Sequence, residues 1–287
     1  MGITSTADDE QARLWNGPAG RGWVEARDVL EEIFRPFEDR LVRAVSGASA
    51  CHVLDVGCGT GGTTFAVAQA LGPSGHCTGI DISEPMIATA RARAARNDVP
   101  ASFICADAQT YVFAPASFDM IISRLGVMFF ADPVRAFANL RHAARPGGAL
   151  RFIAWRGVAE NPFMTTAERA AAPLLPNLPA RRPDGPGQFA FADRQRVAAL
   201  LEASGWSAIE IQPIDFACSF PKAELVRYLS WLGPVGVILQ GMDEPARLRV
   251  VETISAAFAP YLHGEEVRFT AACWMVAAQA PMEAAYG

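Results

Sequence analysis

The sequence lacks the features of an exported or membrane-spanning protein. Its first ten residues, from Met1 to Glu10, are polar and acidic, without the charged and then apolar pattern of an export signal. The most apolar stretches, residues 231–242 and 270–280, are too short to cross a bilayer and contain Gly, Pro or Gln. These two absences predict a soluble protein without a membrane span.

Metal-ligand and disulfide patterns are also missing. The six cysteines include no CxxC pair, and the four histidines show no ligand spacing. We interpret the cysteines as small buried apolar side chains in a reducing compartment. The sequence therefore predicts no metal site and a cytoplasmic location.

Positive charge is scarce as well. Lys and Arg number 25 against 30 Asp and Glu, a formal net charge of −5. Without a basic face to displace counterions from phosphates, a nucleic-acid partner is not expected. A small-molecule substrate fits better, and a homodimer is an allowed assembly. With 51% hydrophobic and 19% charged residues among 287, the chain has enough apolar material for one sizeable core.

The spacing of apolar residues divides the chain into helices and strands. The N-terminal segment shows helical spacing and predicts two helices that meet near Pro36. From residue 51 onward, short apolar runs alternate with helical patterns, which is typical of a parallel sheet with helices on both faces. The predicted strands are residues 51–56, 76–80, 102–105, 118–122 and 150–155. The helices between them cover residues 63–71, 83–96 and 132–146, and Asp132 is expected to cap the last of these.

After residue 155 this alternation ends. A helix is expected from residue 161, followed by a proline-rich stretch over residues 173–187. Further helices are predicted at residues 194–204, 222–232 and 244–258, and strands at 209–216 and 267–277. The predicted fold is α/β: a doubly wound, mostly parallel, seven-stranded sheet with N-terminal helices and a helical lid insertion. We expect residues 1–50 to form an N-terminal helical lid segment and residues 51–155 the ligand-binding core. Residues 156–287 should add the remaining strands and the helical cap within the same domain.

A glycine-rich turn follows the first predicted strand. Gly57, Gly59 and Gly62 fit G-x-G-x-x-G, and Asp81 lies 24 positions past Gly57. This pattern also fits an NAD-binding fingerprint. Asp55 favours a different ligand, because a carboxylate beside the turn would repel a pyrophosphate. S-adenosylmethionine (SAM) has no phosphate and presents an ammonium, a carboxylate and a sulfonium.

Four motifs in this order identify a family resemblance. They are residues 53–62, then Gly79-Ile80-Asp81-Ile82-Ser83 with Met86, then Ala106-Asp107-Ala108, and finally Phe118-Asp119 with the Arg-Pro-Gly-Gly turn near residue 148. The sequence resembles class I SAM-dependent methyltransferases, in particular the small-molecule branch similar to the ubiquinone/menaquinone-biosynthesis type. The resemblance is strong over residues 50–155 and implies a Rossmann-like methyltransferase fold.

The resemblance also implies a set of cofactor-binding residues. Asp81 would bind both ribose hydroxyls, and Ile82 and Met86 would contact the adenine. Asp107 would accept from the adenine amino group, while the Ala108 amide faces a ring nitrogen. The remaining members of this set are Asp55, Gly57 and Gly59 at the glycine turn, and Ser123 and Arg124 beside the methionine end.

The acceptor side is less defined by the sequence. Methyl transfer mainly requires positioning in a dry pocket, so no catalytic dyad is expected. His263 is a candidate general base, and its alternative is a solvated loop histidine. Arg124 is a second candidate, because it could pair with a carboxylate of the cofactor or substrate. The alternative is that it forms a structural ion pair with Asp132 or another acid. Four tryptophans are candidates for the lid or the acceptor pocket, with core packing as the alternative: Trp15, Trp23, Trp155 and Trp231.

The predicted function is SAM-dependent methyl transfer to a small, apolar or aromatic acceptor by in-line displacement, with S-adenosylhomocysteine (SAH) as product. One alternative is an NAD(P)-dependent oxidoreductase that uses the same glycine turn, although this sequence lacks the Tyr-x-x-x-Lys pattern of such enzymes. The other is a catalytically silent SAM-fold binding protein. The sequence does not name the acceptor or the atom that is methylated.

Overall fold

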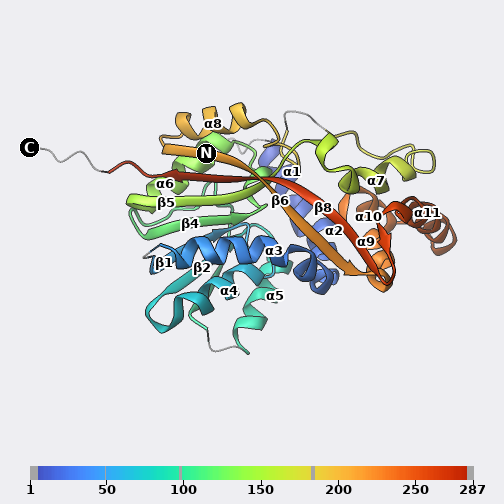
Figure 1. Cartoon of the computed structure of the whole chain (residues 1–287), viewed down its shortest axis with the longest axis horizontal. Helices are drawn as coiled ribbons and strands as arrows, with labels where there is room; N and C mark the ends of the chain where they lie inside the picture. Colours follow the sequence, from blue (N-terminus) through green and yellow to red (C-terminus); the bar gives the residue numbers. More distant parts are fainter. Residues whose placement is uncertain (1–5, 49, 97–98, 182–184, 283–287) are drawn as a thin grey trace, which may run out of the picture.

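A computed structural model describes residues 6–48, 50–96, 99–181 and 185–282 (Figure 1). Residues 1–5 and 49 of the expected lid segment, and 182–184 of the proline-rich stretch, lie outside the described residues. Within the described residues, one sheet has the strand order β3-β2-β1-β4-β5-β8-β6, and a short β7 pairs with β8. The seven strands in this order match the predicted number, and β7 adds a two-residue eighth strand.

The parallel half of the sheet forms because its central strands are short apolar runs that are largely buried on both faces. Its strands are β1 (His52–Val56), β2 (His76–Asp81), β3 (Ala101–Cys105), β4 (Phe118–Arg124) and β5 (Ala144–Trp155). Neighbouring strands in this half are all parallel. The carboxyl ends of these strands therefore meet at one edge, where open α/β sheets bind ligands.

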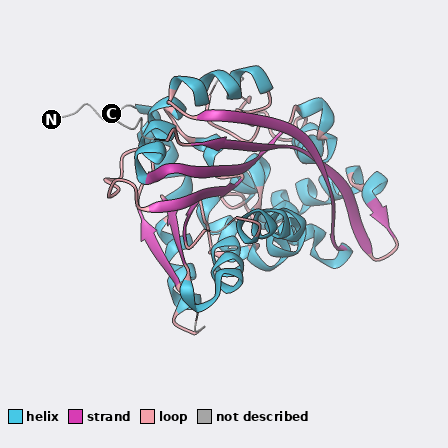
Figure 2. Ribbon diagram, turned by 60° about the vertical axis from the view of Figure 1, so that its left-hand side comes forward, coloured by secondary structure: helices cyan, strands magenta, loops and turns pink. Residues whose placement is uncertain are grey.

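Two long antiparallel strands complete the sheet and extend beyond the parallel strands (Figure 2). They are β6 (Ser207–Pro221) and β8 (Glu266–Gln279), and both are longer than their apolar patterns predicted. The distal part of this pair packs against the cap, where Phe269 of β8 stacks on Phe163 at a centroid distance of 3.8 Å. β7 (Leu262–His263) folds back on β8 at this distal end.

Helices cover both faces of the sheet. On one face lie α3 (Arg27–Ser46) and α4 (Gly62–Leu71), with α5 (Glu84–Ala94) beside β3. On the other lie α6 (Pro133–Ala143) and α8 (Arg194–Ala203). Asp132 caps α6 as expected, since its carboxylate accepts a hydrogen bond from the Arg135 amide at 3.0 Å.

The prediction of a helix break near Pro36 was wrong, because α3 continues through it. A proline inside a helix removes one hydrogen bond and costs about 3 kcal/mol. The buried stripe of α3 continues on both sides of Pro36, and Phe37 stacks on Phe216 of β6 at 4.0 Å. Burying this stripe outweighs the lost bond.

The remaining helices form a cap at the carboxyl end of the sheet (Figure 1). They are α1 (Thr6–Asn16), α2 (Pro18–Glu25), α7 (Pro162–Ala171), α9 (Leu225–Trp231), α10 (Gly233–Leu239) and α11 (Glu244–Ala257). No helix was predicted at α10. The N-terminal part of the cap (α1 and α2) contacts the later part at α10, where the Gln240 side chain donates to the Pro18 carbonyl at 3.2 Å.

Two further sequence predictions concern exposure and membrane spans. Cys51 is exposed and Cys105 is half-buried, so the prediction that the cysteines are buried holds for the other four. Cys51 lies just before β1, where the chain enters the sheet. Among the described residues, no helix is both long and apolar enough to span a membrane.

Candidate active site

A cavity of about 900 Å³ opens at the carboxyl ends of the parallel strands. This size is typical of ligand pockets. Because the strand order is β3-β2-β1-β4-β5, the cavity passes from Asp107 after β3 to Trp155 at the end of β5. We call the part lined by the residues after β1, β2 and β3 the glycine-turn end. The part lined by the ends of β4 and β5 and by the cap is called the cap end.

The glycine turn lies so close to the chain after β4 that a side chain at Gly57 would not fit. Gly57 has a φ of +69°, and a Cβ atom there would lie 2.6 Å from the Cα of Gly126. The amides of Gly57 and Cys58 both donate to the Ile80 carbonyl of β2, at 2.9 and 3.2 Å. These contacts fix the turn on the sheet and present its backbone to the cavity.

Asp81 ends β2 at the cavity wall with only 8% of its surface exposed. Its carboxylate accepts hydrogen bonds from the amides of Gly59 and Ser83, at 2.8 and 2.9 Å. Burial raises the pKa of Asp81, and these backbone hydrogen bonds partly oppose the rise. A carboxylate has about four acceptor positions, so capacity remains for ligand hydroxyls.

The other residues expected around a nucleoside also line the glycine-turn end: Ile82, Met86, Asp107 and Ala108. Asp107 has a local role too, because its Oδ1 accepts a hydrogen bond from the Gln109 amide at 2.8 Å. This contact shapes the turn after β3. Gly59 also lies at the wall, and a Cβ atom there would contact only the Met86 sulfur, at 3.6 Å.

Asp55 does not line the cavity, in contrast to the prediction from its distance to Gly57. It is 1% exposed, and its Oδ2 accepts from the Thr64 hydroxyl of α4 at 2.7 Å. Successive side chains of a strand point to opposite faces. Val56 therefore reaches the cavity, while Asp55 lies beneath the first turn of α4. The argument that Asp55 repels a pyrophosphate directly loses its geometric basis.

Asp55 is an unusual acid in this position. Its Oδ1 is buried with no hydrogen-bond partner among the described residues. Burial raises the pKa of Asp55 to about 6, although the Thr64 hydrogen bond and Arg124 act in the opposite direction. The side chain therefore contributes to the electrostatics below the turn.

Ser123 and Arg124, at the end of β4, have different environments. Ser123 is buried away from the cavity, donates to the Val56 carbonyl at 2.7 Å and accepts from the Gly126 amide at 3.2 Å. It therefore joins β4 to the glycine turn and does not face a ligand. Arg124 does line the cavity, with its guanidinium 5.4 Å from the centroid of the Phe34 ring.

Arg124 is a half-buried cation whose buried Nη1 atom has no hydrogen-bond partner among the described residues. Burial lowers its pKa, and the nearby Glu38, Asp55 and Glu31 oppose this. The expected alternative of an ion pair with Asp132 is not found, because Asp132 caps α6. A buried donor without a partner is costly, so a ligand anion at this point would be stabilised.

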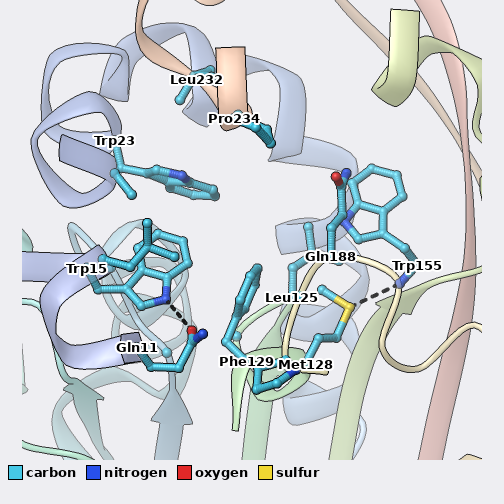
Figure 3. A pocket seen from close by; sticks show the side chains of 18 of the residues that line it. Gln11, Trp15, Trp23, Leu125, Met128, Phe129, Trp155, Gln188, Leu232 and Pro234 are labelled. Atoms are coloured by element: carbon cyan, nitrogen blue, oxygen red, sulfur yellow. Dashed lines mark hydrogen bonds between the residues drawn. The ribbon is translucent and has the colours of Figure 1, made fainter. Parts of the chain in front are cut away.

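Aromatic side chains from α1, α2 and the chain after β4 form the opposite wall (Figure 3). The Trp15 ring packs in T-shaped, edge-to-face contacts with the rings of Trp23 and Phe129, at centroid distances of 6.1 and 5.0 Å. Trp155 lies across the cavity, where its backbone amide contacts the Met128 sulfur at 3.4 Å. Trp231 also lines the cavity, so the structure brings all four expected tryptophans to its wall.

The end of α1 is fastened to the turn after β2 by contacts that the sequence did not indicate. The Asn16 amide group donates to the Ile82 carbonyl at 3.1 Å and accepts from the Glu84 amide at 2.8 Å. Ser83 occupies the N-cap position of α5, yet its hydroxyl donates to the Trp15 carbonyl at 2.7 Å. These bonds place Trp15 over the glycine-turn end.

His263 does not reach the cavity, so its proposed role as general base is not supported by its position. It is exposed on β7, which turns back on β8 at the distal end of the long strand pair. β8 begins within one residue of its predicted start, but its first residues pair with β7 at the end of the long strand pair that extends past the parallel strands (Figure 2), and this places His263 away from their carboxyl ends.

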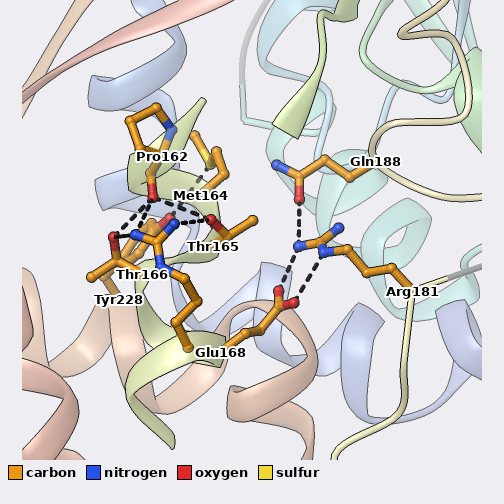
Figure 4. Close-up of polar contacts among 9 residues, drawn as sticks. Pro162, Met164, Thr165, Thr166, Glu168, Arg181, Gln188 and Tyr228 are labelled. Carbon is orange, nitrogen blue, oxygen red and sulfur yellow. Dashed lines mark hydrogen bonds and ion pairs between the residues drawn. The ribbon is translucent and has the colours of Figure 1, made fainter. Parts of the chain in front are cut away.

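The sequence analysis missed a polar cluster at the cap end (Figure 4). Glu168 of α7 pairs with Arg181, and Gln188 contacts the same guanidinium. Tyr228 of α9 also lines the cavity, and its hydroxyl contacts the Met164 sulfur at 4.0 Å. We call Glu168, Arg181 and Gln188 the polar cluster. They are separated in the sequence, and no spacing motif joins them.

The site and fold have clear counterparts among known proteins. Residues 53–148 match the family described as a methyltransferase domain. Nocamycin O-methyltransferase of Saccharothrix syringae is 27% identical over 252 residues, which cover 83% of this chain and 89% of that protein. Aklanonic acid methyltransferase DauC of Streptomyces sp. strain C5 is 35% identical over 122 residues, or 42% of this chain and 56% of that protein. The match thus spans little more than half of DauC.

Two solved structures are similar in fold. The YcgJ protein of Bacillus subtilis has a TM-score of 0.55 at 16% identity, covering 87% of this chain and all (100%) of that one. Phosphoethanolamine N-methyltransferase 2 of Haemonchus contortus, in complex with phosphomonomethylethanolamine and SAH, has a TM-score of 0.50 at 19% identity. That match covers 96% of this chain and 58% of the other. At these identities the similarity shows a shared fold.

The strand order, the glycine turn and the strand-end carboxylates are those of a class I SAM-dependent methyltransferase, and residues 53–148 match a methyltransferase domain. The chain is therefore an enzyme that transfers methyl groups from S-adenosyl-L-methionine to small molecules. The residues present fit this cofactor. The backbone approaches closely at Gly57, Asp81 keeps acceptor capacity, and the Nη1 of Arg124, which has no partner among the described residues, suits a carboxylate.

Proposed function

We propose that the chain methylates a small apolar or aromatic acceptor held at the cap end, by in-line displacement from cofactor held at the glycine-turn end. The observation that supports this most directly is the continuity of the cavity. The same cavity is lined by Asp81 and Asp107 at one end and by Trp23, Phe129 and Trp155 at the other.

At the glycine-turn end, we propose that Asp81 accepts the ribose hydroxyls and Asp107 the adenine amino group. Ile82 and Met86 would flank the adenine, and the Ala108 amide would face a ring nitrogen. We assign the methionine carboxylate to Arg124, because its Nη1 is buried at the wall without a partner among the described residues. Asp55 and Ser123 would support the turn from beneath.

Bound SAM supplies an electrophilic methyl carbon on a sulfonium. The protein's part is then to position the acceptor and to exclude water, and such positioning can lower a barrier by several kcal/mol. Trp15 and Trp23, carried by α1 and α2, cover the cavity from the side of the N-terminus. We therefore propose that residues 1–50 act as a lid over the core of residues 51–155, with residues 156–287 supplying the cap of the same domain.

The names of the relatives support oxygen as the methylated atom. One is an O-methyltransferase, and the other acts on aklanonic acid. An acidic oxygen is already deprotonated at neutral pH and needs no general base. We propose a small acidic oxygen compound as the acceptor of this chain too.

The proposal extends to partners and location. The net charge of −5 favours a small-molecule substrate over a nucleic acid. A homodimer is compatible with the cavity, which is lined by this one chain. We propose the cytoplasm as the compartment, in accord with the free cysteines among the described residues.

Equilibrium dialysis of the full chain with SAH and with NADH tests the cofactor step, and transfer of a labelled methyl group from SAM to candidate aromatic acids tests the reaction. We expect SAH binding, no measurable NADH binding, and label in the acid. NADH binding without SAH binding would favour the oxidoreductase alternative. SAH binding without transfer to any of a broad set of acceptors would favour the catalytically silent alternative.

A further inference from the structure

The polar cluster at the cap end has a defined hydrogen-bonding capacity. The Arg181 Nε donates to Oε2 of Glu168 at 2.9 Å, and its Nη2 contacts the other carboxylate oxygen at 2.5 Å. The same Nη2 contacts Oε1 of Gln188 at 3.4 Å, and the guanidinium lies 4.8 Å from the centroid of the Phe189 ring. Glu168, Arg181 and Gln188 all line the cavity.

The cluster has donors left over but little net charge. The carboxylate of Glu168 compensates the charge of Arg181 through both of its oxygens. Nη1 of Arg181 has no hydrogen bond within the described residues, and the Gln188 amide oxygen is used while its NH₂ group remains. The cluster therefore offers N–H donors at a site that is close to electrically neutral.

The position of the cluster places it on the acceptor side of the cavity. The Gly187 amide donates to the Met128 carbonyl, just after β4, at 3.1 Å. Glu168 belongs to α7, which follows β5. In the strand order, β4 and β5 lie on one side of β1, whereas β2 and β3, which Asp81 ends and Asp107 follows, lie on the other. Figure 3 shows Gln188 beside Trp155, so an aromatic surface adjoins the donors.

We propose that Arg181 and Gln188 bind an uncharged oxygen, such as a ring-conjugated carbonyl, on the acceptor, and thereby select oxygenated ring compounds over plain hydrocarbons. Arg181 and Gln188 are half-buried, so an apolar acceptor would displace water from their free N–H donors without replacing its hydrogen bonds, which disfavours such an acceptor. A second carboxylate at this point would instead face the carboxylate of Glu168. The inference rests on the proposed function and adds a second contact, separate from the oxygen that is methylated.

Three matched probes test this on the full chain saturated with SAH: 2-acetonaphthone, its oxygen-free analogue 2-ethylnaphthalene, and 2-naphthoate. Quenching of tryptophan fluorescence gives the dissociation constants. We expect the ketone to bind about tenfold more tightly than the hydrocarbon, as two ordinary hydrogen bonds allow. 2-Naphthoate reports whether the cavity binds an aromatic acid, the kind of acceptor proposed above.

Variants then assign the preference to the cluster. Gln188→Met removes one donor and leaves the ion pair, and the ketone preference should fall to about threefold. The double variant Glu168→Met with Arg181→Met replaces the pair without leaving an unpaired buried charge, and the preference should fall nearly to one. Arg169→Met is the matched control. Arg169 follows Glu168 on α7 and bonds to Thr165 and Thr166, but it is not among the residues that line the cavity.

The outcomes separate this inference from the proposed function. Equal binding of ketone and hydrocarbon by the wild type would overturn the inference. So would a preference for the ketone over the hydrocarbon that survives in both cluster variants. An unchanged SAH affinity in every variant is expected, because the cluster lies away from the glycine-turn end. Loss of all probe binding with SAH still bound would contradict the aromatic acceptor and this inference together, while failure of SAH to bind would contradict the cofactor step.

Discussion

At the glycine-turn end the cavity is lined by the turns after β1, β2 and β3, which we call the backbone wall, whereas at the cap end it is lined by helices such as α2, α7, α9 and α10, which we call the cap wall. The backbone wall follows from the parallel strands and their tight turns, with Gly57 against Gly126 and Asp81 bonded to amides. The cap wall depends on contacts between segments far apart in the chain. A turn that binds a constant cofactor can be built into the sheet, while a variable acceptor is met by helices and loops that can change without disturbing it.

The largest effect is expected where the backbone wall is tightest. Gly57→Ala places a methyl group 2.6 Å from the Gly126 backbone, at a φ of +69°. Strain and overpacking together should cost about 3–5 kcal/mol of unfolding free energy and abolish SAH binding. Chemical denaturation measures the first and calorimetry the second.

Gly72→Ala is the control for this substitution. Gly72 also has a positive φ, of +67°, but a Cβ atom there would meet nothing within 4 Å. Its ψ of −164° places it in a region that only glycine populates readily, so alanine should cost about 1–3 kcal/mol, from backbone strain alone, and leave SAH binding intact. Equal costs at the two glycines would show that the contact between the turn and Gly126 is not critical.

The next effect concerns the buried acid beneath the turn. The pKa of Asp55 is about 6 in the folded protein, raised by burial from an ordinary value of 3.8. Between these values the native state holds a proton that the unfolded state has lost, so stability is fully present below about pH 4 and is lost as pH rises through 6. The loss should amount to at most about 3 kcal/mol.

Urea denaturation of the wild type and of Asp55→Asn from about pH 2 to about pH 7, a range that covers both pKa values, measures this contribution. The unfolding free energy of the wild type, relative to the variant, should fall as the pH rises through 6. Asp119 gives a control of opposite sign, because hydrogen bonds from His52 and Cys51 and the ion pair with Arg145 lower its pKa despite some burial. Its contribution should be lost as pH falls below 4. Parallel curves for the wild type and Asp55→Asn would rule out a titrating Asp55.

The smallest effect is expected from the hydrogen bonds that connect α1, in the proposed lid, to the turn after β2 in the core. Asn16→Ala removes the bonds to the Ile82 carbonyl and the Glu84 amide, and each partner is exposed enough to be rehydrated. The loss of about 1 kcal/mol should raise the dissociation rate of SAH about fivefold, with little change in melting temperature. Stopped-flow displacement measures the rate, and Glu25→Ala, an exposed change on α2, is the control. A rate that Asn16→Ala leaves unaltered would make α1 a passive covering.

The sequence predicted the cofactor half of the fold well, because each strand there is a buried apolar run that ends at a turn residue. The bounds of the first five strands agree with the structure to within a few residues, apart from the early start of β5. The helix at α10 was missed because Gly233, Pro234 and Gly236 conceal a short apolar helix that tertiary packing stabilises. The break at Pro36 was predicted from local cost alone, whereas burial on both sides of it decided the outcome.

For the site, the sequence indicated types of residue more reliably than their directions. Asp81, Asp107 and Met86 reach the cavity, yet Asp55 and Ser123 point away from it. Successive side chains of a strand point to opposite faces, and the sequence alone does not indicate which of the two faces meets the cavity. The pair Glu168 and Arg181 could not be predicted, since a loop of irregular path brings these side chains together. Four tryptophans reach the wall, but their spacing alone did not distinguish a pocket from a core.

The central claim is that the cofactor lies at the glycine-turn end with its ribose on Asp81. Calorimetric titration of SAH into the wild type, Asp81→Asn and Asp55→Asn tests it most directly. Loss of charge-assisted hydrogen bonds should weaken SAH binding by Asp81→Asn about 30- to 150-fold, or about 2–3 kcal/mol, while Asp55→Asn should change it less than about threefold. A 2′-deoxy SAH analogue should bind less tightly than SAH to the wild type but nearly as tightly as SAH to Asp81→Asn. A folded Asp81→Asn variant that binds SAH as the wild type does would contradict the account.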